Sequence, residues 1–259
     1  MMFLKGFLIG LQFFTAVPIR RELPMDSEHL GKTVQAFPLL GLFQGIIYAS
    51  LFFLLKEWTP FSHLAAAFLL WLATILLTGG IHLDGWMDAS DAYFSYGNQE
   101  KRLEIMKDPR TGAFGVLSVI VLLSCRFLFI FEITETTPYF LIAAIPFFSK
   151  SVMGLLLVTV PSSRKEGLAA MFQTAVSLKL LIIYPIFIII FLVLVIFLNE
   201  NIIHVTILLL AAGGCYFLCR RNVSNWFGGI TGDVLGASVE GTELFLWMTV
   251  WLLHYFVMA

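Results

Sequence analysis

Long apolar stretches separated by short polar connections dominate the chain. A helix needs about 20 predominantly apolar residues to cross the hydrocarbon core of a bilayer. Seven stretches meet this requirement and predict transmembrane helices, at residues 33–55, 62–81, 113–131, 138–160, 180–198, 202–219 and 243–258. An eighth stretch, 3–19, contains glycines and Gln12, so it fits either a span or a helix that lies at the membrane interface. The pattern predicts an all-α fold, a polytopic membrane helical bundle that forms one domain over residues 1–259.

The composition agrees with a membrane protein and disfavours other classes. Hydrophobic residues make up 59% of the 259 residues, charged residues only 13%, and the mean hydropathy is +0.90. A soluble domain normally carries about 25% charged residues, so a soluble enzyme, a disordered chain and a disulfide scaffold are all disfavoured. The three cysteines lie in apolar stretches without metal-ligand spacing and are expected to act as small hydrophobic residues. The net charge of -1 creates no field for nucleic acid, so the lipid bilayer is the expected partner.

The basic residues are distributed unevenly over the connecting loops. Twelve of the 16 lie in alternate loops: Arg20, Arg21, Lys32, Lys101, Arg102, Lys107, Arg110, Arg164, Lys165, Lys179, Arg220 and Arg221. Loops rich in lysine and arginine stay on the cytoplasmic side of a membrane protein. We therefore expect a multi-pass protein of the cell membrane (the inner or plasma membrane). Its two long polar connections, 82–112 and 220–242, should face the cytoplasm and carry the active site, because function concentrates in loops and helix ends.

The first connection begins with an acidic motif directly after an apolar stretch. Asp84, Asp88 and Asp91 are spaced i, i+4 and i+7, which places their carboxylates on one face of a helix. Neighbouring carboxylates repel one another unless a cation neutralises them, and oxygen ligands alone select a hard ion such as Mg²⁺. His82 is the histidine that adjoins this motif. The alternative is a solvated acidic face at a helix end, but charge that continues an apolar span is usually functional.

Two further polar motifs carry candidate chemistry. Residues 101–115 contain four cations and two glycines, which favours phosphate binding, although an ordinary positively charged loop would look similar. Residues 228–237 contain four glycines around Asp233. The glycines would let this carboxylate meet the first motif and complete a metal site, or they would only allow helices to pack closely. Glu240 and Glu243 are either neighbours of that site or exposed.

Two basic residues interrupt predicted spans. Lys150 lies near the middle of 138–160, where a charge is costly, so we expect a phosphate or carboxylate partner for it. Arg126 lies near the outer end of 113–131, where its long side chain can extend to the interface. We therefore expect Arg126 to be structural.

Taken together and in this order, the motifs resemble those of the cobalamin synthase family, the adenosylcobinamide-GDP ribazoletransferases of vitamin B12 biosynthesis. The resemblance rests on Gly79-Gly80-Ile81-His82-Leu83-Asp84-Gly85 followed by Asp88 and Asp91, on residues 102–115 with their Met-Lys-Asp-x-Arg-x-Gly-Ala-Phe-Gly core, and on residues 229–237. The order, the separations and the surrounding apolar spans match over nearly the whole chain. The chain departs from the family in Ala92, where glycine is common, and in Lys150, where arginine is frequent.

The resemblance implies a transferase with two substrates. The ribose 3'-hydroxyl of α-ribazole, or of its 5'-phosphate, attacks adenosylcobinamide-GDP at the phosphorus attached to cobinamide. GMP leaves, and adenosylcobalamin or its 5'-phosphate forms. Such a transfer depends mainly on charge neutralisation and alignment. The sequence leaves open which acceptor is preferred and whether the protein is a homo-oligomer.

The resemblance and the acidic motifs together give the candidate site residues. The expected catalytic and Mg²⁺-binding residues are four aspartates: Asp84, Asp88, Asp91 and Asp233. Asp91 is the favoured general base, and Lys107 and Arg110 are expected to neutralise charge on the leaving GMP. The expected substrate-binding residues are His82, Lys107, Asp108, Arg110, Gly112, Thr231 and Lys150.

Three other functions fit less well. A CDP-alcohol phosphotransferase would carry Ala-Arg after its Asp-Gly, where this chain has Trp86-Met87. An aspartate-rich prenyltransferase would repeat its aspartate motif, whereas the second acidic centre here is the single Asp233. A secondary transporter would show internal repeats and binding sites near the membrane midplane, but no repeat is visible and the acids cluster at the ends of spans.

Overall fold

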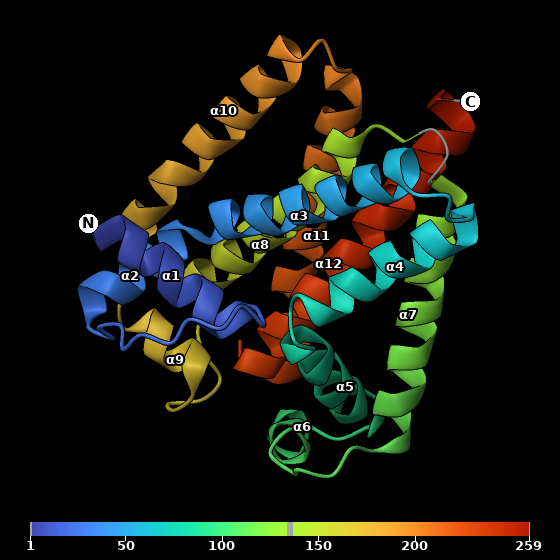
Figure 1. The fold of residues 1–259 in the computed structure, drawn as a ribbon. Helices are drawn as coiled ribbons and strands as arrows, with labels where there is room; N and C mark the ends of the chain where they lie inside the picture. Colours follow the sequence, from blue (N-terminus) through green and yellow to red (C-terminus); the bar gives the residue numbers. More distant parts are fainter. Residues whose placement is uncertain (1, 134–136, 259) are drawn as a thin grey trace.

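The computed structural model describes residues 2–133 and 137–258 (Figure 1). Its elements, in chain order, are α1 (Met2–Phe14), α2 (Ser27–Gln35), α3 (Phe37–Trp58), α4 (His63–Leu76), α5 (Ile81–Phe94), α6 (Gln99–Ile105), α7 (Ala113–Ile133), α8 (Tyr139–Thr159), α9 (Leu168–Gln173), the 3-10 helix η1 (Leu178–Ile182), α10 (Ile183–Phe197), α11 (Ile202–Phe227), α12 (Gly232–Leu253) and the π-helix η2 (His254–Met258). No strand occurs in these two ranges, where Ser162 and Ile230 form an isolated parallel bridge. The predicted all-α fold is confirmed.

Within the described ranges, five helical segments are long and apolar enough to cross a membrane. They are α3, α7, α8, the segment Leu178–Phe197 formed by η1 and α10, and α11. A sixth crossing results if α4 and α5, which are bent by 79° relative to each other, count as one broken span. The multi-pass helical membrane bundle is therefore confirmed, and five or six of the seven expected spans meet this criterion of length and composition.

A glycine turn interrupts the predicted span 62–81. α4 ends at Leu76, Gly79 and Gly80 have φ values of 64° and 76°, and α5 begins at Ile81. Residues with a side chain rarely adopt this left-handed conformation, so the two glycines allow the chain to end one helix and start another in a new direction. The acidic helix α5 consequently turns away from α4 instead of extending it (Figure 1).

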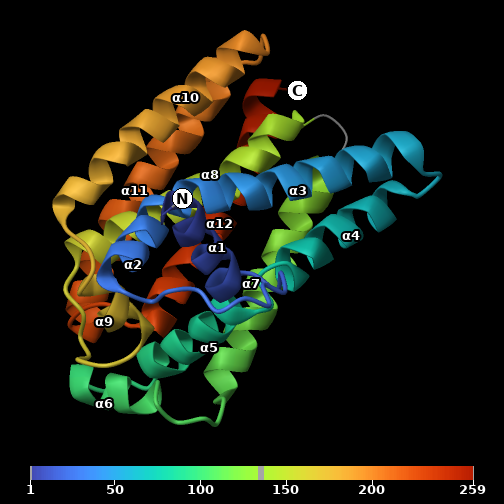
Figure 2. The ribbon, with the colours of Figure 1, turned by 60° about the vertical axis from the view of Figure 1, so that its left-hand side comes forward.

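The last predicted span, 243–258, begins too late in the chain. α12 already begins at Gly232, and its three acidic residues explain why it is not among the five apolar spans. The helix packs against α5, α7, α8 and α11, and two views show it surrounded by these helices (Figures 1 and 2). A helix with charges in such a position needs partners for them inside the protein.

The N-terminal stretch 3–19 forms a short helix, α1, that ends at Phe14. Its 13 residues extend about 20 Å at 1.5 Å per residue, which is shorter than the hydrocarbon core of about 30 Å. α1 packs against α2 and α3. Its length therefore disfavours the alternative in which this helix crosses the membrane by itself.

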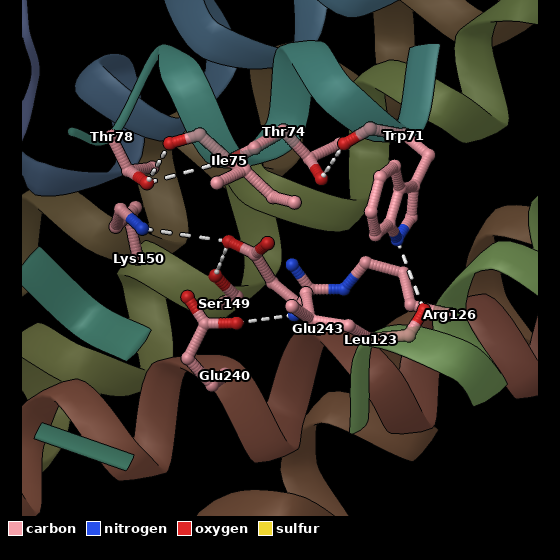
Figure 3. Close-up of polar contacts among 10 residues, drawn as sticks. All are labelled: Trp71, Thr74, Ile75, Thr78, Leu123, Arg126, Ser149, Lys150, Glu240 and Glu243. Carbon is pink, nitrogen blue, oxygen red and sulfur yellow. Dashed lines mark hydrogen bonds and ion pairs between the residues drawn. The ribbon is translucent and has the colours of Figure 1, made fainter. Parts of the chain in front are cut away.

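Two buried basic residues of neighbouring helices form ion pairs with two acidic side chains of α12 (Figure 3). Arg126 of α7 forms an ion pair with Glu240. Lys150 of α8 has its Nζ 3.4 Å from Oε1 of Glu243, and the same oxygen accepts a hydrogen bond of 2.9 Å from Ser149 Oγ. The side chains of Arg126, Lys150, Glu240 and Glu243 are between 0% and 6% exposed, and we call these four residues the buried quartet.

The buried quartet tests three predictions made from the sequence. Arg126 does not extend to the membrane interface, because only 1% of its side chain is exposed. Glu240 and Glu243 are not exposed; they are buried and form ion pairs with basic residues of other helices. Of the two partners considered for Lys150, the structure shows a carboxylate. Each buried charge faces an opposite charge, which is the condition under which a protein interior tolerates it.

The polar connections gather at one end of the bundle. Figures 1 and 2 both show α5, α6 and α9 at this end, whereas the α10–α11 hairpin extends from the other. The connections are more helical than the sequence suggested: α5 and α6 occupy most of 82–112, and α11 continues to Phe227 before α12 begins.

Candidate active site

α5 carries the three aspartates of the first motif on one helical face, as their spacing predicts. Asp84 is exposed, while Asp88 and Asp91 are partly buried. The helix begins directly after Gly80, so Asp84 lies in its first turn. A negative charge at this position is stabilised by the free backbone N–H groups at the helix start.

Asp233 approaches this helix because α5 and α12 cross at two glycines. A Cβ atom on Gly85 would lie 2.5 Å from the carbonyl oxygen of Asp233, and one on Gly236 would lie 3.2 Å from the backbone of His82. The contact at Gly85 leaves no room for a side chain and the one at Gly236 is tight, so the two glycines permit this approach of the helices. Thr231 caps the first turn of α12, and its Oγ1 donates a hydrogen bond of 3.4 Å to Asp233 Oδ2. The structure thus brings the two acidic motifs together.

The gathered carboxylates repel one another. The pKa of Asp88 is raised from 3.8 to about 6, first by burial and then by the charges of Asp84, Asp233 and Asp91, whereas Arg164 lowers it. This helix lies outside the five long apolar segments, at the polar end of the bundle. A bound cation would relieve this repulsion.

The carboxylates do not form a complete metal cage. Within the described ranges, no group of three or more histidine, cysteine or acidic side chains is arranged closely enough to hold a metal ion alone. Mg²⁺ does not require such a group, because it commonly uses one or two carboxylates and takes its other ligands from substrate phosphates and water. Asp84, Asp88 and Asp233 offer the hard oxygen ligands that such a shared site needs.

Asp91 differs from the other aspartates because it binds the start of α7. Its Oδ2 accepts a hydrogen bond of 2.7 Å from the N–H of Gly112, and its Oδ1 accepts one of 2.9 Å from the N–H of Gly115. Both carboxylate oxygens therefore hold backbone donors that a helix terminus otherwise leaves free. The geometry favours a positioning role for Asp91 over the role of general base.

Asp91→Ala is expected to lower the free energy of unfolding by about 2 kcal/mol, because two backbone N–H groups lose a charged acceptor. Thermal and denaturant unfolding of the purified protein in detergent measures this change. Asp84→Ala is the matched comparison and should leave stability unchanged or slightly raised, since it relieves repulsion among the carboxylates. Equal losses in the two variants would contradict the anchoring role of Asp91.

Among the described residues, the cations of the second motif form no ion pair with the carboxylates of α5 and α12. Lys107 is exposed, and the Arg110 side chain is 86% exposed and binds Asp108, with Nη2 2.6 Å from Oδ2. The guanidinium holds the pKa of Asp108 at about 2. From this motif, the backbone N–H groups of Gly112 and Gly115 are what reach the acidic helix. The placement of Lys107, Asp108 and Arg110 therefore gives no direct support to a role in binding the leaving group.

Arg164 is the basic residue that the structure places beside the carboxylates. It follows α8, and its Nη1 lies 3.5 Å from Asp233 Oδ2 while its Nη2 donates a hydrogen bond of 2.9 Å to the carbonyl oxygen of Leu103. In the sequence Arg164 stands out only as one of twelve loop cations. Its partner is 69 residues away, so no local pattern could identify it.

A cavity of about 240 Å³ lies where α5 and α12 cross. The ring of Phe14 stacks on His82 at this cavity, with the ring centroids 6.0 Å apart. The polar and aromatic residues that line this cavity are His82, Asp84, Asp233, Phe14, Phe37 and Phe172. A larger cavity of about 620 Å³ lies on the opposite face of α5, between α7 and α11, and is lined mainly by apolar and aromatic side chains. The smaller cavity is the candidate reaction site because carboxylates border it.

Comparisons with known proteins agree with this arrangement. A family model described as cobalamin-5-phosphate synthase matches residues 6–251. Three similar proteins are each named adenosylcobinamide-GDP ribazoletransferase. Those of Geobacillus sp. (strain WCH70) and Geobacillus thermodenitrificans are 40% identical, over 98% and 96% of both chains, and that of Clostridium tetani is 34% identical over 95% of both chains. No solved structure matches the chain. The family match extends over nearly the whole sequence, so the resemblance seen in the motifs is confirmed and the chain belongs to the cobalamin-5-phosphate synthase family.

Proposed function

We propose that this protein joins adenosylcobinamide-GDP to α-ribazole, or to its 5'-phosphate, with release of GMP. The shared name of the curated relatives describes this activity for them. The observation that carries the proposal in this chain is the crossing of α5 and α12, which brings Asp84 and Asp233 to the edge of one cavity. A transfer between two phosphate esters needs such an arrangement of charges rather than a covalent intermediate on the protein.

In the proposed reaction, the 3'-oxygen of the acceptor forms a bond to the phosphorus next to cobinamide. The bond from this phosphorus to the bridging oxygen breaks, and GMP leaves with that oxygen and its negative charge. Asp84 accepts the hydroxyl proton, because it is exposed at the cavity whereas both oxygens of Asp91 already bind backbone N–H groups. Asp88 and Asp233 would hold Mg²⁺, which supplies positive charge to the diphosphate.

The proposal includes a location and an orientation. We assign the protein to the cell membrane, with α5, α6 and α9 at the cytoplasmic face. Two observations support this orientation. The first is that cations lie in or next to these helices: Lys101 and Arg102 in α6, Lys107 and Arg110 after it, and Arg164 and Lys165 before α9. The second is that both helices lie at the same end of the bundle as α5.

Inside-out membrane vesicles that contain the protein test the activity, the metal and the orientation together. After addition of adenosylcobinamide-GDP, α-ribazole and Mg²⁺, we expect GMP and a corrinoid product in equal amounts by chromatography. EDTA should lower the rate by about 100-fold or more, and excess Mg²⁺ should restore it. Right-side-out vesicles should react only after permeabilisation. Absence of GMP from permeabilised membranes would contradict the activity, and indifference to EDTA would contradict the metal.

A further inference from the structure

Arg164 lies among carboxylates that must accept a strongly anionic substrate. Its Nη1 is 3.5 Å from Asp233 Oδ2, which is longer than the 2.7–2.9 Å typical of a charge-assisted hydrogen bond. Its Nε is buried and has no hydrogen-bond partner among the described residues. The side chain is 21% exposed and that of Asp233 is 27% exposed. The guanidinium therefore has donor capacity left over, next to a solvent-accessible carboxylate.

The backbone that carries Arg164 is firmly held. The N–H of Ser163 donates to the carbonyl oxygen of Ile230 at 3.0 Å, and the N–H of Ile230 donates to the carbonyl oxygen of Pro161 at 2.9 Å. Ser162 Oγ donates a hydrogen bond of 2.8 Å to the carbonyl oxygen of Arg164 itself. This short pairing ties the loop after α8 to the residues just before α12. The position of Arg164 relative to Asp233 is thus fixed in the backbone, while its side chain keeps unused donors.

We propose that Arg164 binds the diphosphate of the GDP-activated donor, on the leaving-group side, and that its pair with Asp233 is the arrangement before the donor arrives. This inference rests on the proposed function. A diphosphate entering between Asp84, Asp88 and Asp233 needs compensating positive charge, and a planar guanidinium can donate to two phosphate oxygens at once. The exposed Arg110, already bound to Asp108, does not offer this at the cavity.

Arg164 exchanges one anion for another in this scheme. On donor binding, Nη1 leaves Asp233 and donates to an oxygen of the phosphate that becomes GMP, the second N–H of Nη2 donates to a neighbouring oxygen, and the first keeps its hydrogen bond to Leu103. As the 3'-oxygen bonds to the phosphorus next to cobinamide, the bridging bond breaks and negative charge grows on the GMP phosphate. Arg164 stabilises this charge, while the hydroxyl proton passes to Asp84.

Binding of GDP, which carries the diphosphate but cannot react, tests this role separately from turnover. Wild type, Arg164→Gln, Arg164→Lys and the matched control Lys165→Gln are compared in detergent by titration calorimetry with GDP and Mg²⁺. Lys165 is the exposed neighbouring residue. Arg164→Gln should weaken GDP binding and raise the KM for the donor by about 10- to 100-fold, with the KM for α-ribazole little changed. Arg164→Lys should fall between, and Lys165→Gln should match wild type.

Several outcomes would overturn the proposal. One is a folded Arg164→Gln protein that binds GDP as Lys165→Gln does. A second is an Arg164→Gln protein with a lower unfolding midpoint but unchanged GDP affinity, because this result would indicate a purely structural residue. A third is an equal change in the KM for the donor and the KM for the acceptor. If Arg164→Gln does not fold, Arg164→Lys provides the test: weaker GDP binding supports the proposal, and unchanged GDP binding contradicts it. A wild-type protein that binds GDP through Arg164 but releases no GMP with both substrates contradicts only the proposed reaction.

Discussion

Asp84→Asn is expected to lower kcat for GMP release by about 1,000-fold, with little change in the KM of either substrate. Asparagine has nearly the same shape as aspartate but cannot accept the hydroxyl proton, and general-base catalysis contributes about 100- to 10,000-fold to rates of this kind. Steady-state measurement of GMP release by purified protein in detergent gives both constants. The variant should fold normally, because Asp84 is an exposed side chain at the start of α5.

The neighbouring carboxylate should respond differently. Asp88→Asn is expected to raise the Mg²⁺ concentration needed for half-maximal activity, because it removes an oxygen ligand. Glu104→Gln is the matched control, since Glu104 is exposed on α6 and pairs only with Lys101 at 3.0 Å among the ion pairs of the described chain. Near wild-type GMP release by both Asp84→Asn and Asp88→Asn would refute the assignment of this site.

Arg126→Met is expected to lower the free energy of unfolding by about 3–5 kcal/mol, because Glu240 is left in the interior without its counter-charge. The double variant Arg126→Met/Glu240→Met should regain most of this loss, since replacing a buried pair by apolar groups of similar size is often neutral. Denaturant unfolding of wild type, Arg126→Met, Glu240→Met and the double variant measures four free energies. These four proteins form a complete cycle, so the coupling between the residues can be obtained directly.

A peripheral basic residue provides the control for this cycle. Lys165→Met removes an exposed charge and is expected to change stability by less than about 0.5 kcal/mol. If Arg126→Met were as stable as Lys165→Met, the arginine would not neutralise Glu240 in the folded protein. If the double variant were no more stable than Arg126→Met, the loss would come from packing rather than from the uncompensated charge.

Local sequence patterns predicted those parts of the structure that depend on near neighbours. The spacing of Asp84, Asp88 and Asp91 placed them on one helical face, and the apolar stretches located α3, α7, α8, α10 and α11. One of the two alternatives for the glycines around Asp233, that they let this residue approach the first motif, is confirmed. Each of these inferences uses residues separated by a few positions or by one helix length, which is the range over which periodicity carries information.

The remaining features depend on residues far apart in the chain. Arg126 is 114 residues from Glu240, and Arg164 is 69 residues from Asp233. Without its partner, Arg126 resembled a side chain that extends to the interface, and Arg164 resembled any cation of a cytoplasmic loop. The break at Gly79 and Gly80 could not be predicted for a different reason. Glycines are tolerated within apolar membrane helices, so hydropathy alone predicted a span that continued to residue 81.

The buried quartet also has a consequence for how the protein is assembled. α12 follows α7 and α8 in the chain, and each acidic residue at the centre of a membrane helix opposes insertion by a few kcal/mol. Arg126 and Lys150 belong to α7 and α8, which leave the ribosome earlier, so the two positive charges are in the membrane before Glu240 and Glu243 arrive. α12 can therefore enter the membrane against neighbours that neutralise it. The order of synthesis matches the charge pairing, because the helices with the two cations precede the helix that carries Asp233 to the candidate active site.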